Sequence, residues 1–353
     1  MVYGIICEFN PFHSGHKYLI DSIKKDGDSV ICVMSGNFVQ RGEPAVYNKY
    51  ERTRAALEGG ADLVIELPTE CAVQSAQGFA EAGVKLLEST GVCDAIAFGA
   101  ECDNVDELKR ISREIKEKDS DIKAVLKSGV SYPSARREVI GSPALDYPNN
   151  ILAIEYLSCT SLPAVAVKRI GKGHDSGDRE YSSSEIRAHL PEESIASLQN
   201  CENAVMYRLR TMNTEDFRKL DDVSEGLENR IAEAVKTAKD IDSLYSMIKT
   251  KRFTHSRIRR IILRAFLGID RNTPKNPLYL HILGFNSKGR ELLTKMKDSA
   301  ELPLITRYGD ARALGGEILA AYERECRYSD IYNIMYKEIR PCSQEQTAQL
   351  VLL

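Results

Sequence analysis

The sequence predicts an α/β fold, in which a Rossmann-like, doubly wound parallel sheet of five strands precedes a mainly helical C-terminal part. Two patterns support this prediction. Through the first two-thirds of the 353 residues, short apolar runs alternate with longer amphipathic ones, as in sheets covered by helices on both faces. From about Ser184 the strand pattern fades and helical periodicity takes over. We therefore expect an α/β domain over residues 1–190 and a mainly helical domain over residues 191–353.

Five segments are expected to form the strands. Each is short, rich in Val and Ile and free of polar alternation, as expected of parallel strands that are buried on both faces. In chain order they are Val2–Cys7, Ser29–Met34, Asp62–Leu67, Asp94–Phe98 and Pro163–Val167. Ligands of such sheets bind beyond the carboxyl ends of the strands, so the segments after each strand are the candidates for a functional site.

Helical patterns fill the intervals and most of the C-terminal part. Between the strands they cover His16–Lys25, Lys49–Glu58 and Gln77–Ser89. Further along, they cover Pro191–Leu198, Ala204–Leu209, Thr214–Leu220, Gly226–Lys239, Ile241–Lys249 and Ser256–Gly268. Two later apolar segments allow a further short α/β piece, near His281–Phe285 and Leu302–Ile305.

Composition excludes several classes of protein. A formal net charge of −3 excludes a uniformly basic nucleic-acid binder, so any contact with nucleic acid must come from a local patch. The nine cysteines include no C-x-x-C pair and mostly sit in apolar runs, which favours buried thiols over disulfides or zinc ligands. No segment approaches the roughly 20 apolar residues needed to span a bilayer, and the N-terminus lacks a basic region typical of signal peptides. We expect a cytoplasmic protein.

The first predicted strand runs directly into a segment with two histidines, Glu8-Phe-Asn-Pro-Phe-His-Ser-Gly-His16. Pro11 restricts the turn, and Gly15 lets the backbone approach a bound group closely. His13 and His16 are three residues apart, so in a first helical turn their rings share one face beside N–H groups that favour phosphate. Two imidazole donors there could hold phosphate oxygens while pyrophosphate is displaced. The alternatives are two unrelated loop histidines or a metal-binding pair.

Three residues beyond the fourth predicted strand are further candidates. Gly99 follows the fourth strand, where a missing side chain leaves room for adenine or ribose, although a simple strand-end turn is the alternative. Asn150 can contact a ligand, cap a helix over Ile151–Leu157, or do both. Arg169, just past the fifth strand, is well placed for phosphate, whereas an isolated arginine is more often a solvated surface charge.

A serine-rich segment follows the fifth strand, Tyr181-Ser-Ser-Ser-Glu-Ile-Arg187. Hydroxyl groups, backbone N–H groups and a guanidinium can together hold the β- and γ-phosphates of a nucleotide. A plain helix cap is the alternative interpretation. The candidates for phosphate contact are Ser182, Ser183, Ser184 and Arg187.

Between Lys249 and Ile269 there are seven Lys or Arg residues and no carboxylate. Within a net-acidic protein, a basic helix without carboxylates favours contact with an RNA backbone, although such a run is usually a solvated helix face. The candidates for RNA contact are Lys251, Arg252, Arg257, Arg259, Arg260 and Arg264.

The histidine segment resembles the HxGH motif of the nucleotidyltransferase superfamily, and the longer match resembles the bacterial tRNA(Met) cytidine acetate ligase family. The match begins with Gly4–His16 and continues with Met34–Ala45, Phe98–Glu101, Tyr147–Asn150, Val167–Arg169, Asp221–Arg230 and Lys251–Arg260. Because these segments span nearly the whole chain, the resemblance covers both expected domains.

The resemblance implies an enzyme that uses ATP to convert acetate into acetyl-adenylate, without acetyl-CoA. It then transfers the acetyl group to N4 of the wobble cytidine of elongator tRNA(Met), giving N4-acetylcytidine. Residues 1–190 would bind ATP and catalyse, and residues 191–353 would bind the tRNA. Magnesium is expected to accompany ATP, although no carboxylate cluster identifies a protein ligand for a metal. No obligate protein partner is indicated.

The family pattern also assigns individual residues. His13 and His16 correspond to the catalytic pair, and the serine-rich segment resembles the second superfamily motif, which often has Ala or Thr at one of the serines. Independently of the family pattern, the loop Ser35–Gly42 follows the second strand and has glycines around polar side chains, so Gln40 and Arg41 are candidates to shape the acetate pocket or receive the cytidine. The ATP contacts map onto Ile6, Cys7, Glu8, Phe9, Asn10, Pro11, Phe12, His13, Ser14, Gly15, His16, Lys17, Tyr18, Leu19, Gly99, Asn150 and Arg169.

Two other functions use the same site. A cofactor-type adenylyltransferase would act on a small phosphate compound, but the large helical extension and the basic run argue against it. A non-catalytic nucleotide- or RNA-binding protein could retain the fold, but intact His13, Gly15 and His16 argue against that.

Overall fold

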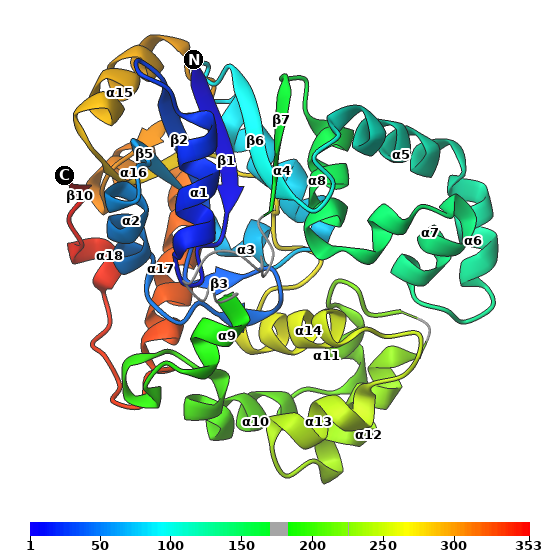
Figure 1. Ribbon diagram of the computed structural model, residues 1–353. Coiled ribbons are helices and arrows are strands. Elements are labelled where there is room, and N and C mark those ends of the chain that lie inside the picture. Colours follow the sequence, from blue (N-terminus) through cyan, green and yellow to red (C-terminus); the bar gives the residue numbers. More distant parts are fainter. Residues whose placement is uncertain (170–182, 225) are drawn as a thin grey trace.

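The computed structural model describes residues 1–169, 183–224 and 226–353. At its centre is a parallel sheet with the strand order β7-β6-β1-β2-β5 (Figure 1). These are the five predicted strands, and each begins and ends within one or two residues of the prediction. Their bounds are β1 Val2–Cys7, β2 Ser29–Ser35, β5 Leu63–Leu67, β6 Ala95–Ala100 and β7 Ala164–Lys168.

Helices cover both faces of the sheet, as predicted from the absence of polar alternation in the strands. On one face, Ile5 and Cys32 pack with residues of α1 (Ser14–Ile23) and α2 (Lys49–Glu58). On the other face, Ile6 and Ile31 belong to a core shared with several helices. Those helices are α4 (Ala76–Glu88), α5 (Val105–Glu117), α8 (Pro148–Cys159) and α15 (Ser287–Ser299).

The C-terminal part returns to the sheet and extends it beyond the five predicted strands. β8 (Leu280–Phe285) pairs antiparallel with β5, and both β9 (Leu304–Ile305) and β10 (Val351–Leu352) pair parallel with β8. Among the described residues the sheet therefore has eight strands. The further α/β piece predicted near residue 281 is confirmed, but the prediction did not place it in the same sheet. β10 has only two residues, too few for a strand pattern to be recognised.

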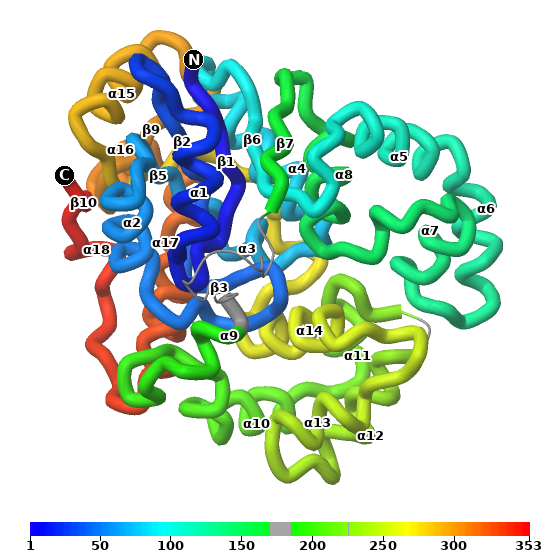
Figure 2. Tube along the Cα trace, viewed as in Figure 1, coloured from blue at the N-terminus to red at the C-terminus, as the bar shows by residue number. Residues whose placement is uncertain are grey.

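A helical unit follows the parallel strands, as predicted, and contains α10 (Glu202–Arg210), α11 (Thr214–Arg218), α12 (Leu227–Thr237), α13 (Ile241–Ile248) and α14 (His255–Leu267). Its apolar core is continuous with Phe38 and Val73 of the sheet part and with Tyr332 of α17 (Gly316–Asn333). Figure 2 shows this unit, in green and yellow, beside the carboxyl ends of the strands. The two expected domains therefore share a core.

The predicted helix over Pro191–Leu198 is wrong. The chain instead forms two short 3₁₀ turns, Glu192–Ser194 and Leu198–Cys201, with extended backbone between them. In that extended stretch the backbone N–H of Ala196 donates to the carbonyl of Val46 at 3.0 Å. In a helix this N–H would bond to a carbonyl of the same helix. Here it instead holds the extended stretch against the sheet part.

The remaining elements are short. After β2 come β3 (Phe38–Val39), β4 (Glu43–Pro44) and, past β5, α3 (Thr69–Ala72). The others are α6 (Asp119–Leu126), α7 (Tyr132–Ile140), α9 (Ser183–Ala188), α16 (Tyr308–Leu314) and α18 (Gln344–Thr347).

The nine cysteines, all within the described ranges, are free, as predicted. In those ranges, no helix combines the length and the apolar character needed to cross a bilayer.

Candidate active site

The first helix begins at the histidine segment. After β1 the chain turns at Phe9, whose φ of 46° is left-handed, and passes through a cis Asn10–Pro11 bond. His13 is the N-cap of α1, and its Nδ1 accepts a hydrogen bond from the backbone N–H of Gly15 at 3.1 Å. An accepting Nδ1 carries no proton, so the proton of the neutral imidazole lies on Nε2. His13 is therefore fixed in the tautomer that has its donor on the far side of the ring from Gly15.

The His13 ring also explains the glycine of the motif. A Cβ atom at Gly15 would lie 3.0 Å from Cε1 and 3.2 Å from Nδ1 of that ring. Contacts this short would push the imidazole away from its hydrogen bond. The sequence predicted that Gly15 allows close approach to a bound group, and in the structure the group in close approach is His13 itself.

His13 and His16 lie on one face of α1, as predicted. Their rings stack with centroids 3.8 Å apart, and the Phe9 ring packs against His16 at 4.8 Å. Burial, together with the neighbouring His13 and the charge of Arg169, lowers the pKa of His16 well below its usual value. Burial and Arg169 also lower the pKa of His13. Both rings are therefore neutral near pH 7, and the buried Nδ1 of His16 has no hydrogen-bond partner among the described residues.

Other residues of the predicted ATP-binding stretch differ in how they are placed. The side chains of Ile6, Cys7 and Leu19 are buried in the sheet core. Lys17 is exposed and pairs with Asp21 on the next turn of α1. The side chains of Ile6, Cys7 and Leu19 are therefore not exposed to a bound nucleotide, whereas that of Lys17 is accessible.

Gly99 and Arg169 meet at the ends of β6 and β7. Gly99 lies within β6 opposite Val167, so the interpretation of Gly99 as a strand-end turn is wrong. A Cβ atom at Gly99 would be 3.5 Å from Cγ of Arg169, which is an ordinary contact. Protein atoms alone therefore leave room for a side chain at Gly99. The Arg169 side chain is largely exposed, and its Nε lies 3.8 Å from a carboxylate oxygen of Glu101.

Asn150 is buried and its side chain is used within the protein. Its Oδ1 accepts from the backbone N–H of Cys102 at 2.9 Å, and its Nδ2 donates to the carbonyl of Ala144 at 3.1 Å. The N-cap of α8 is Tyr147, so the interpretation of Asn150 as a helix cap is wrong. Asn150 instead holds the turn that follows β6.

Arg187 comes from α9 to the histidine loop. Its Nη1 donates to the carbonyl of Asn10 at 2.7 Å, and burial lowers its pKa. The structure thus brings Arg187 close to the histidine loop, and its predicted contact with phosphate stays a prediction. Ser182 lies outside the described residues, and Ser183 and Ser184 are described only as the start of α9.

The glycine-bounded loop after β2 lies against Glu8. The backbone N–H of Gln40 donates to Glu8 Oε1 at 2.7 Å, while the Gln40 side chain donates to the carbonyl of Gln74 at 3.3 Å. Burial raises the pKa of Glu8, and the Gln40 hydrogen bond and the charge of Arg41 oppose that rise. The loop is therefore adjacent to the histidine segment, with Arg41 exposed.

Sequence reasoning missed Arg52 of α2. Its side chain is fully buried and donates to the carbonyls of Glu8 at 2.7 Å and Ser35 at 3.0 Å. It also donates to the carbonyls of Gly36 and Tyr47. This guanidinium joins the ends of β1 and β2. An arginine inside a polar helical segment gives no sequence signal for such a role.

Two of the six candidates for RNA contact, Arg260 and Arg264, are buried, and their burial argues against a place on an RNA-binding face. Arg264 is fully buried, with Nη1 3.0 Å from Asp222 Oδ2 and Nη2 2.5 Å from the carbonyl of Val73. Arg260 is also buried beside Asp222, and Arg257 donates to the Asp222 carbonyl at 2.6 Å. The enclosed guanidinium groups of Arg260 and Arg264 cannot reach an RNA phosphate, whereas Arg257 is only half-buried. We call these three arginines and Asp222 the arginine clamp.

The other candidates of that run are nearer the surface. Lys251 is exposed and Arg252 is half-buried. Arg259 is paired with Glu43 of β4, so its charge is already partly neutralised.

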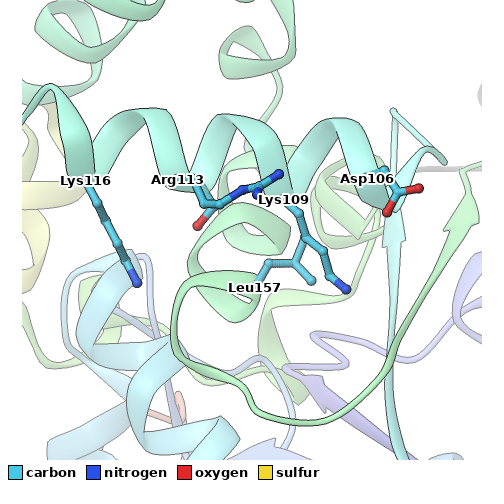
Figure 3. Close-up of a pocket in the computed structure, with 6 residues that line it drawn as sticks. Asp106, Lys109, Arg113, Lys116 and Leu157 are labelled. Carbon is cyan, nitrogen blue, oxygen red and sulfur yellow. The ribbon is translucent and has the colours of Figure 1, made fainter.

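Helix α5 carries a second basic surface that sequence reasoning did not single out. A groove of about 420 Å³ lies along α5 and α8. Figure 3 shows five of the residues that line it, Asp106, Lys109, Arg113 and Lys116 on α5 and Leu157 on α8. The three basic side chains are exposed. Lys116 donates to the carbonyl of Ser158 at 2.7 Å. Within the described ranges, the side chains of Lys109 and Arg113 make no ion pair or hydrogen bond.

One cluster in the described residues has the composition of a metal site. Glu66, His281 and Glu345 are buried, with ligand atoms within 4.8 Å of one another. The ammonium of Lys49, however, lies 2.6 Å from Glu66 and 2.7 Å from Glu345. This ammonium already supplies the positive charge that a metal would bring, so we assign no metal to the cluster.

The fold and the sequence match known proteins. The HIGH Nucleotidyl Transferase family matches residues 1–201 and 190–347. A tRNA(Met) cytidine acetate ligase from Acetivibrio thermocellus is 34% identical, with 100% of both chains covered. Another from Thermoanaerobacter sp. is 36% identical over 95% of this chain and 96% of that protein. A crystal structure of Thermotoga maritima TmcAL bound with alpha-thio ATP matches with a TM-score of 0.90 and 29% identity. The structural match covers 100% of this chain and 99% of the Thermotoga maritima chain.

Proposed function

The chain belongs to the HIGH nucleotidyltransferase family and, within it, to the tRNA(Met) cytidine acetate ligases, and from this premise we propose how its residues divide the reaction. In the first half-reaction, an oxygen of acetate attacks the α-phosphorus of ATP and pyrophosphate leaves. In the second, N4 of the wobble cytidine of elongator tRNA(Met) attacks the carbonyl carbon of acetyl-adenylate. AMP leaves, the amine loses one proton, and N4-acetylcytidine is formed.

His13 and His16 act in the first half-reaction. The stacked pair at the N-terminus of α1 is the observation that carries the proposal. Two neutral imidazoles at the N-terminus of α1, where the helix dipole favours negative charge, present donors to phosphate oxygens as charge builds on them. Arg169, whose charge acts on His16, and Arg187, which donates to Asn10, add positive charge for the pyrophosphate that leaves.

Other residues position these groups. Gly99 leaves the space beside Arg169 open for the adenosine, and Asn150 holds the turn next to it. Gln40 and Arg41 border the side of the loop where acetate would enter, close to Glu8.

Magnesium would reach the site with ATP and would be held mainly by the phosphates, where it neutralises their charge. The carboxylates nearest the loop are otherwise engaged. Glu8 accepts from Gln40, and Glu101 accepts from the Asn149 amide at 2.6 Å and lies next to Arg169. We assign no protein ligand to the ion.

The tRNA backbone contacts exposed basic residues outside the arginine clamp. Lys109 and Arg113 on α5 and Lys251 before α14 are exposed. Exposed, uncommitted cations release counterions when they neutralise phosphates, and this drives binding to RNA. A tRNA substrate also implies that the protein acts in the cytoplasm.

The proposal is tested by following the two half-reactions separately. Purified protein with ATP, acetate and labelled pyrophosphate should exchange label into ATP without tRNA. Adding elongator tRNA(Met) and labelled acetate, without acetyl-CoA, should then yield labelled N4-acetylcytidine. Exchange that is independent of acetate, or exchange supported only by a small phosphate compound, would contradict the acetate-ligase assignment.

A further inference from the structure

A second pocket, of about 220 Å³, lies next to the active-site loop, between the sheet part and the helical unit. Two of its walls are tied to Asn10. Arg187 donates to the Asn10 carbonyl at 2.7 Å, and the backbone N–H of Val46 donates to Asn10 Oδ1 at 2.8 Å. The other walls include Glu43, Asp242, Tyr245 and Arg259. The pocket therefore adjoins the loop that holds His13 and His16.

Tyr245 is the unusual member of this pocket. Its side chain is 7% exposed, yet its hydroxyl is buried with no hydrogen-bond partner among the described residues. A buried hydroxyl without a partner costs about 1–3 kcal/mol, and such groups in native proteins generally have a water or a ligand as partner. Arg259 lies over the Tyr245 ring, with its guanidinium carbon 5.8 Å from the centroid. The pocket thus offers an aromatic ring, a cation and an unused polar group.

The charges of the pocket favour a neutral heterocycle over a phosphate. Arg187 and Arg259 would attract an anion, but the carboxylates of Glu43 and Asp242 line the same space. Glu43 already pairs with Arg259, so the local charge is close to balanced. A nucleobase carries both donors and acceptors on its edges, and RNA-binding proteins commonly hold unstacked bases with aromatic rings and arginine planes.

We infer that this pocket binds the base of the acceptor cytidine, an inference that rests on the proposed function. The base, turned out of the anticodon loop, packs against the Tyr245 ring. The Tyr245 hydroxyl donates to an acceptor on the pyrimidine edge, O2 or N3. A pocket carboxylate accepts one N4 hydrogen and can take up the proton that the amine loses. The position beside Asn10 brings N4 to the adenylate that His13 and His16 help to form.

The first test compares Tyr245→Phe with Tyr207→Phe. Both changes remove one hydroxyl in the helical unit, but Tyr207 is 73% exposed and outside the pocket. Loss of a hydrogen bond worth about 1.4 kcal/mol should lower kcat/KM for acetyl transfer to tRNA about tenfold in Tyr245→Phe. Tyr207→Phe should transfer acetyl at the wild-type rate. Equal transfer rates in the two variants would overturn the inference.

The second test measures binding without ATP, so it remains informative whether or not adenylate forms. Elongator tRNA(Met) is compared with the same tRNA carrying an abasic wobble nucleotide, in wild type and in Tyr245→Phe. If Tyr245 contacts the base, removal of the base weakens binding less in the variant than in wild type. Equal losses in both proteins would overturn the inference. Wild-type protein without acetate-dependent pyrophosphate exchange would instead contradict the proposed function, and the binding comparison would still decide what the pocket holds.

Discussion

In the histidine pair, neighbouring groups determine the tautomer, the orientation and the charge of each ring. His13 receives its tautomer from the Gly15 backbone, and His16 is held by the stacked His13 and by Phe9. Because burial keeps both rings neutral, they can donate a hydrogen bond but carry no fixed positive charge. Neutral donors gain most when negative charge appears on the reacting phosphate, which is the requirement for stabilising a transition state.

Replacing either histidine should therefore affect the rate more than folding. We expect His13→Gln and His16→Gln each to lower acetate-dependent pyrophosphate exchange by about 100- to 1,000-fold, the usual cost of losing a donor that acts in the transition state. His255→Gln, at an exposed position at the start of α14, is the matched control. Exchange close to wild type in both active-site variants would remove the pair from the mechanism.

The lowered pKa of His16 also predicts how stability depends on pH. As the pH falls through about 6.5, His16 gains a proton in the unfolded chain but stays neutral in the folded one. The unfolded state then binds more protons, so the free energy of unfolding decreases, by at most about 1.4 kcal/mol per pH unit for this group. Urea unfolding between pH 7.5 and 5 should show a shallower pH dependence in His16→Gln than in wild type. An unchanged slope would mean that His16 titrates normally.

Much of the site could be predicted residue by residue, because the motif residues follow strand ends and the spacing of His13 and His16 is local. The parts that could not be predicted depend on contacts between distant segments. Arg52 reaches carbonyls at two strand ends, and Asn150 reaches a turn 48 residues earlier in the chain. Sequence pattern alone cannot tell such buried polar side chains from surface ones.

At the scale of single elements, α14 shows why a charge run is an ambiguous signal. Arg260 and Arg264 are buried along with the isoleucines of the helix. Asp222 contacts the guanidinium groups of three arginines, through its carbonyl oxygen to Arg257 and through its carboxylate to Arg260 and Arg264. Burial lowers the pKa of Arg260 to about 10 despite that carboxylate. Asp222 lies outside the helix and before the run, so counting charges between 249 and 269 could not reveal the pairing.

The arginine clamp should contribute strongly to stability. Asp222→Asn removes the charge but keeps a residue that tolerates the left-handed φ of 62° at this position. It leaves the buried Arg264 without its carboxylate, and breaking such a buried pair typically costs about 3–5 kcal/mol. Chemical denaturation should show this loss, while the exposed Asp298→Asn on α15 should change stability by less than about 0.5 kcal/mol. If Asp222→Asn also lowered the free energy of unfolding by less than about 0.5 kcal/mol, the clamp would not be needed for folding.

On the scale of the whole molecule, the C-terminal part of the chain adds strands to a sheet whose other strands lie in the N-terminal half. β8 extends the sheet next to β5, and Lys49 of α2 joins Glu66 of β5 to Glu345 of α18 through fully buried ion pairs. The sequence correctly predicted the parallel strands because their patterns are local and strongly apolar. The strands added by the C-terminal part could not be assigned to this sheet, because β8, through which β9 and β10 join it, pairs with a strand more than 200 residues earlier.

Finally, the distribution of charge over the molecule predicts which surface holds tRNA. The net charge is −3, so binding depends on cations that are exposed and uncommitted, and α5 presents two of them, Lys109 and Arg113. Changing both to Gln should weaken tRNA binding. The double change should also flatten the log–log salt dependence by about 0.7 to 0.9 for each phosphate that the protein no longer neutralises.

The matched control changes Lys295 and Lys297 to Gln on α15, which also removes two exposed positive charges but lies at the opposite edge of the sheet from α5 (Figure 1). Because the two double variants have the same net charge, a difference between them reports the position of the charges and not their number. Pyrophosphate exchange without tRNA should stay at the wild-type level in both, since neither surface touches the histidine loop. If tRNA affinity and its salt dependence decrease equally in both double variants, binding depends on the net charge of the protein, and α5 is an ordinary solvated helix.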